Sequence, residues 1–154
     1  MSNANLITQK DHTIGDAAVD GLLNGIIAGV GMGLYILLIF LVNSVPAGEI
    51  IKYFGNVTES PLVSALIHLA ISGIYGVLFG LAFSVFSNRW RKLLSIWVVL
   101  LAGIVYGALL WLVATYVVFN GSPSVEIIPG VHLLIAHIVF GVFLGFLTGR
   151  SGSE

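Results

Sequence analysis

The chain has 154 residues, of which 58% are hydrophobic and only 8% are charged, and its formal net charge is −1. Soluble domains carry roughly 25% charged residues, so this composition excludes an ordinary globular protein. The absence of cysteine excludes disulfides, thiolate catalysis and cysteine-bound clusters. No basic patch is present, so no nucleic acid partner is expected. A mean hydropathy of +1.06 indicates instead an integral membrane protein surrounded by membrane lipid.

Residues 1–15 are predicted to form a polar, cytoplasmic N-terminal tail. Residues 1–12 hold one lysine, without the basic start and short apolar core of a cleavable signal peptide. Thr13 or Asp16 is suited to cap the first helix, because side-chain oxygens there can accept hydrogen bonds from unpaired backbone N–H groups.

Four apolar segments follow, each longer than the roughly 20 residues that cross a bilayer. Pro61 and Pro129 suit the first positions of the second and fourth helices. The sequence therefore predicts an all-α integral membrane protein, with one four-helix transmembrane bundle over residues 16–150 in up-down-up-down order and a C-terminal tail at 151–154. The predicted spans are about 17–45, 60–87, 93–119 and 128–149.

Small residues recur at every fourth position in the first, second and fourth spans. Residues four apart lie one above another on a helix. Lipid exerts no hydrophobic force that drives helices together, so close backbone contact at small residues becomes the main source of association. These glycine ridges, a glycine-zipper pattern, are predicted helix contacts: Gly21, Gly25, Gly29 and Gly33; Ser72, Gly76 and Gly80; Gly141, Gly145 and Gly149.

A histidine precedes the small residues in the second and fourth spans. Both segments, from His68 and from His137, read His-x3-small-x3-Gly-x3-Gly. The echo indicates a parallel duplication of a two-helix unit, spans one and two against spans three and four. Both histidines are predicted on the order of 10–13 Å inside the outer leaflet, on helices that run in the same direction. An ionisable residue at such depth is a functional hypothesis by default.

Two interpretations of His68 and His137 remain open. They could supply both axial ligands of a haem b or another tetrapyrrole, with the glycines beneath making room for the macrocycle. Alternatively, each packs between helices and bonds to Ser64, Ser72, Thr115 or a carbonyl. Ridges of small residues are typical of helices in direct contact, which leaves no gap for a porphyrin, so packing is favoured.

The four spans and paired histidines resemble four-helix cytochromes b. The chain lacks the two histidines, well separated on one helix, that these proteins carry. The resemblance therefore implies at most one haem and no electron path across the membrane.

The other polar residues offer little chemistry. His132 is expected at the membrane interface, and the histidine pair with Glu126 is too small a ligand set for zinc. Asp20 and Asn24 lie four apart near the cytoplasmic end and could begin a proton or cation path. No ionisable residue continues that path, and carboxylates favour a helix N-terminus, so a capping role is favoured. With no catalytic constellation, enzymatic turnover is not expected.

Tyr75 and Tyr106 fall in mid-span, and each precedes a glycine. A buried tyrosine hydroxyl needs a hydrogen-bond partner, so these two residues are expected to tie the second and third helices together. Trp97, Trp111 and Tyr116 fit aromatic belts at the membrane surfaces or contacts with lipid.

Three classes of function therefore remain. The favoured one is an accessory subunit of a larger, energy-transducing membrane complex, since the chain is small, has short loops and carries glycine ridges suited to docking. The second is a redox or pigment-binding protein that uses His68 and His137 in electron transport. The third is a small channel or transporter that works as an oligomer.

The basic residues are distributed unequally between the two sides of the predicted bundle. Only Lys52 lies on the side opposite the termini, and by the positive-inside rule both termini are predicted to be cytoplasmic. The basic residues on the side of the termini are Lys10, Arg89, Arg91, Lys92 and Arg150.

This topology can be checked with single cysteines introduced at Ser2 and Ser124. Because three of the four predicted spans lie between the tail and the last loop, a membrane-impermeant maleimide should label the two positions from opposite faces. Labelling of both cysteines from the same face would contradict the predicted topology.

Overall fold

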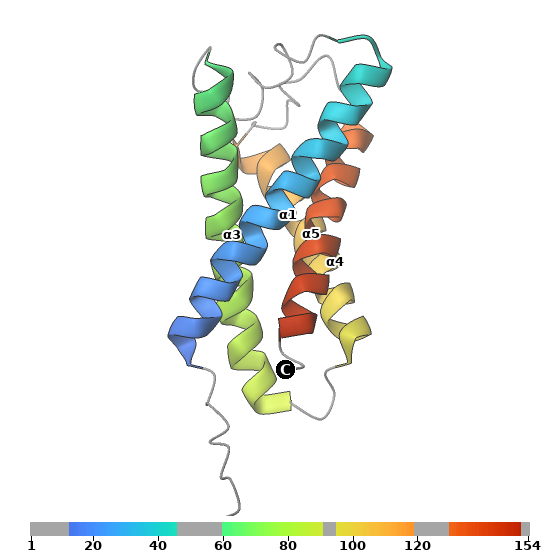
Figure 1. The fold of residues 1–154 in the computed structure, drawn as a ribbon. Helices are drawn as coiled ribbons and strands as arrows, with labels where there is room; N and C mark the ends of the chain where they lie inside the picture. The colour runs from blue at the N-terminus through green and yellow to red at the C-terminus, as the bar shows by residue number, and fades with distance from the viewer. Residues whose placement is uncertain (1–12, 46–59, 91–94, 119–129, 152–154) are drawn as a thin grey trace, which may run out of the picture.

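The computed structural model describes residues 13–45, 60–90, 95–118 and 130–151 of the chain (Figure 1). Of these residues 94% are helical and none forms a strand, which confirms the all-α class. Four helices are long and apolar enough to cross a membrane. Most of the expected N-terminal tail, the loop after the first span and Glu126 lie outside the described residues.

The first helix, α1, spans Ile14–Val42 and begins three residues before the expected start. The reason is a capping box. Thr13 Oγ1 accepts a hydrogen bond from the Asp16 backbone N–H at 3.1 Å, and Asp16 Oδ2 accepts one from the Thr13 N–H at 3.0 Å. The helix ends where the Asn43 side chain donates to the Ile39 carbonyl at 2.7 Å and Ser44 takes a left-handed φ of 61°.

The remaining helices are α3 (Pro61–Trp90), α4 (Ile96–Val113) and α5 (Gly130–Ser151). A π-helical turn, η2 (Ala114–Val118), extends α4 at its C-terminal end. Helix α3 continues three residues beyond the expected end at Ser87, because neither proline nor glycine follows Gly80 before residue 90 to interrupt it.

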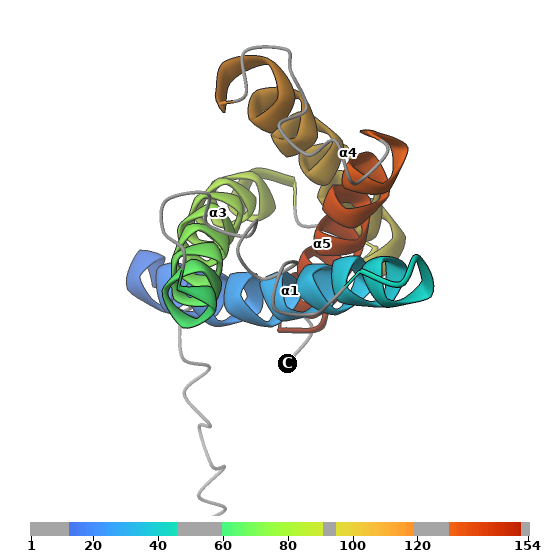
Figure 2. The ribbon, with the colours of Figure 1, turned by 90° about the horizontal axis from the view of Figure 1, so that it is seen from above.

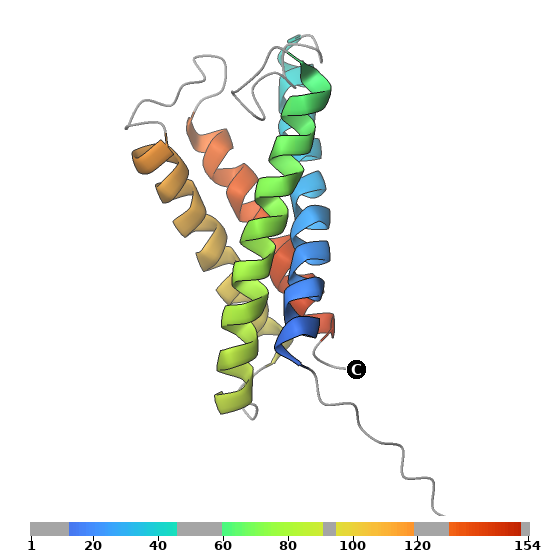
Figure 3. The same ribbon diagram turned by 90° about the vertical axis from the view of Figure 1, so that its left-hand side faces the viewer.

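The helices form two hairpins that are joined side by side. In Figure 1, α1 and α4 run upward while α3 and α5 run downward. Helix α1 packs along α3, α4 packs along α5, and α1 and α5 join the two hairpins, whereas α3 and α4 hardly meet. Figures 2 and 3 show α3 and α4 separating toward the upper end. The bundle is therefore an open row, α3–α1–α5–α4, with one side left unclosed.

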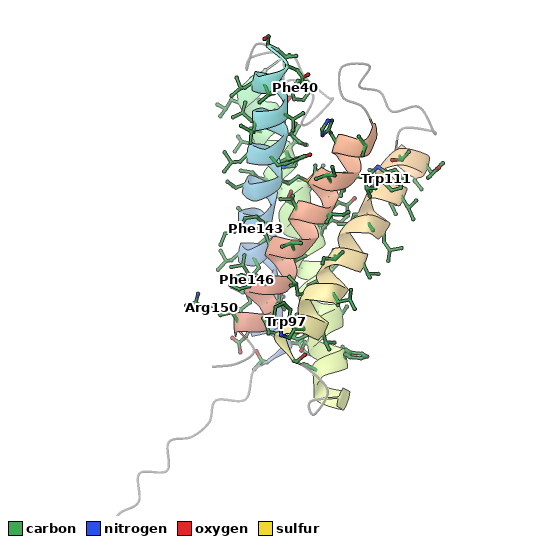
Figure 4. All side chains as sticks on the ribbon, turned by 90° about the vertical axis from the view of Figure 1, so that its right-hand side faces the viewer. Phe40, Trp97, Trp111, Phe143, Phe146 and Arg150 are labelled. Carbon is green, nitrogen blue, oxygen red and sulfur yellow. The ribbon has the colours of Figure 1, made fainter. Side chains whose placement is uncertain are left out.

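Large apolar side chains cover the outside of this row, and few of them reach its centre. Figure 4 labels three on the surface, Trp97, Phe143 and Phe146, which are 74%, 43% and 48% exposed, with Arg150 at the lower end of α5. The buried core between α1 and α5, completed by α3 and α4, consists of Ala28, Met32, Ile36, Phe40, Phe79, Leu110, Ala136, Phe140 and Leu144.

Within the first hairpin, the backbones of α1 and α3 meet at small residues. A Cβ on Gly25 would lie 2.7 Å from the Cα of Gly76, and a Cβ on Gly21 would lie 2.5 Å from the Gly76 carbonyl oxygen. At Gly80 a Cβ would come 2.6 Å from the Ala17 carbonyl oxygen. Gly33, the last residue of the predicted ridge on α1, is partly buried.

The second hairpin repeats this contact. A Cβ on Gly103 would lie 2.8 Å from the Cα of Gly145, and one on Gly141 would meet the Gly103 carbonyl oxygen. In the first hairpin Gly25 contacts Ser72 and Gly76. In the second hairpin Gly103 contacts the corresponding residues, Gly141 and Gly145. The structure therefore extends the sequence repeat to the packing: α1 corresponds to α4, and α3 to α5. Gly149 differs, since it faces the side chains of Ile96 and Val99.

Replacing Gly76 with alanine should destabilise the fold strongly, because the new methyl group would overlap the Gly21 carbonyl and lie 2.5 Å from the Gly25 Cα. Such overpacking costs typically ~1–3 kcal/mol. Gly130→Ala is the matched control, since no atom lies within 4 Å of a Cβ at that position. Reversible unfolding in mixed micelles, followed by circular dichroism, measures the difference, and equal stabilities would show that the backbones are not in contact at Gly76.

Candidate functional site

His68 lies on α3, one turn before Ser72, and is directed at α1. Its Nε2 is 3.1 Å from the carbonyl oxygen of Gly29. A carbonyl can only accept a hydrogen bond, so Nε2 carries the proton and donates it, which leaves Nδ1 as the acceptor nitrogen of the ring. His68 therefore links the two helices of the first hairpin.

His137, the corresponding residue of α5, has a different partner. Its Nδ1 lies 2.8 Å from the carbonyl oxygen of Leu133, one turn earlier on the same helix. By the same argument Nδ1–H donates, and Nε2 carries the lone pair. His137 forms no link to α4, although the backbone of Gly107 lies directly against its carbonyl group.

The residue that follows each histidine by one turn explains this difference. In the first hairpin it is Ser72, and a Cβ on Gly29 would meet the Ser72 side chain, with Oγ at 2.5 Å. The serine side chain thus occupies the helix contact and leaves room for the His68 ring to reach α1. In the second hairpin it is Gly141, which lets the helices come backbone to backbone at Gly107, so the His137 ring turns back to its own helix.

This arrangement gives no support to the bis-histidine haem hypothesis. The two rings bond to different carbonyls. In His68 the bonded atom is Nε2, the nitrogen through which histidine usually ligates haem iron. Among the described residues, no group of three or more His, Cys, Asp or Glu side chains could hold a metal ion. The geometry is that of histidines which bond within and between helices.

Tyr106 connects the two helices that otherwise hardly meet. Its hydroxyl donates to the Tyr75 carbonyl oxygen at 2.9 Å, and its ring centroid lies 5.2 Å from that of Phe79. This confirms the expectation that Tyr75 and Tyr106 tie the second and third helices together, although Tyr75 contributes its backbone.

By the repeat, Tyr106 corresponds to Ala28 and Tyr75 to Leu144, both fully buried between α1 and α5. Large rings therefore hold α3 and α4 apart at the level where small and aliphatic side chains let α1 and α5 meet.

His132 has a partner that the sequence does not reveal. Its Nδ1 lies 3.0 Å from the hydroxyl of Tyr35, which joins α1 to α5 near the upper end, and both residues are partly buried. Ninety-seven residues separate the two in the chain, so no local pattern could have paired them. His132 therefore links α5 to α1, a role that its expected position at the membrane interface did not include.

Several polar side chains are buried near the ends of the helices. Asn24 is 9% exposed and Asp20, one turn below it, is partly exposed. Thr148 is 8% exposed, and its Oγ1 has no hydrogen-bond partner among the residues that the structure describes. The Oγ1 of Thr115, in the π-helical turn, is also buried without a partner in the described part of the chain, so Thr115 does not bond to His68 or His137 as the sequence had allowed.

Removal of the Tyr106 hydroxyl tests the link between α3 and α4. Tyr106→Phe keeps the ring but loses the bond to Tyr75, which should lower the free energy of unfolding by about 0.6–1.7 kcal/mol. Spin labels at Val63 on α3 and Val117 on η2, which are 42% and 72% exposed, should then report a broader distance distribution by pulsed electron paramagnetic resonance. An unchanged distribution would mean that this hydrogen bond does not hold the two helices.

No protein-family model, characterised protein or solved structure matches the chain.

Proposed function

We propose that the protein is a non-catalytic integral membrane subunit, an accessory component of a larger, energy-transducing membrane complex. The observation that carries this proposal is the distribution of side chains. Glycines and hydrogen-bonded polar groups lie between the helices, and large aliphatic residues cover the outside. In each span's most apolar window, only 22% to 28% of the residues are buried. Such a surface requires lipid or other membrane helices to cover it.

The aromatic residues of α4 and η2 support a position across the bilayer. Trp97 is 74% exposed and Tyr116 is 64% exposed. Nineteen residues separate them, which corresponds to roughly 28 Å along a helix. This matches the hydrocarbon thickness of about 30 Å, with tryptophan and tyrosine at the two interfaces where they are enriched. We propose that the ends near Trp97 and Arg150 face the cytoplasm, in agreement with the positive-inside rule.

The use of the polar groups supports a structural role. His68, His132 and Tyr106 each bond to another helix, and His137 bonds to its own. These groups hold the row of helices together instead of assembling a reactive centre. Glycine contacts fix each hairpin, so the protein offers a rigid unit with apolar outer faces, as helix docking within a membrane complex requires.

Native electrophoresis of membranes solubilised in mild detergent tests this role. The protein should migrate in an assembly much larger than its own mass of 16.4 kDa. Photo-reactive benzoylphenylalanine at Leu38 or Leu109, which are 59% and 52% exposed, should cross-link to one specific membrane polypeptide.

Leu144 is the matched control because it is fully buried and should give no cross-link to another chain. Lipid adducts alone from every exposed position, together with migration as a monomer, would contradict the proposed role.

A further inference from the structure

We draw no further inference here: the strongest candidate, the apolar face of α4 on which Leu101, Val105 and Leu109 are exposed, carries none, because nothing in the structure shows what covers it.

Discussion

Backbone-to-backbone contact within each hairpin is the constraint on which the rest of the structure depends. At Gly76 and Gly103 there is no space for even a methyl group, so these positions set the distance between paired helices. That distance in turn decides what each histidine can reach. Where the side chain of Ser72 lies against Gly29, His68 bonds to the Gly29 carbonyl; where the His137 carbonyl lies against Gly107, the His137 ring bonds within its own helix.

The two halves of the chain share a packing pattern but not a role. If the repeat were strict, α3 would meet α4 as α5 meets α1. Ala28 on α1 and Leu144 on α5 are fully buried in the core, and their counterparts on α4 and α3 are Tyr106 and Tyr75. Because a tyrosine ring is far larger than a methyl group, the second contact cannot form at the same distance. The asymmetry of the row therefore arises where Tyr106 and Tyr75 lie. There α3 and α4 do not pack closely, and the Tyr106 hydroxyl links them by one hydrogen bond.

Much of this architecture can be predicted from the sequence, because hydropathy and four-residue spacing are local properties of a helix. They locate four helices, the face of Gly21 and Gly25, and the repeat around His68 and His137. The structure adds what depends on pairs of distant residues. A backbone carbonyl such as that of Gly29 or Leu133 has no signature in the sequence, so the histidine partners could not be identified beforehand. The partner of Tyr35, His132, could not be identified beforehand for the same reason. Nor could the separation of α3 from α4, which we attribute to the large ring of Tyr106 in place of the small Ala28.

The hairpin arrangement also has a consequence for the order in which the protein assembles. In each hairpin the tightest contacts join helices that follow one another in the chain, so α1 and α3 can pair as soon as both have been synthesised. The contact between α1 and α5 must wait until the last helix has been synthesised. Until then the face of α1 that carries Ala28, Met32 and Ile36 lacks its α5 partner. Those side chains are aliphatic, so an incomplete chain exposes no buried charge on this face while it waits for its C-terminal helix.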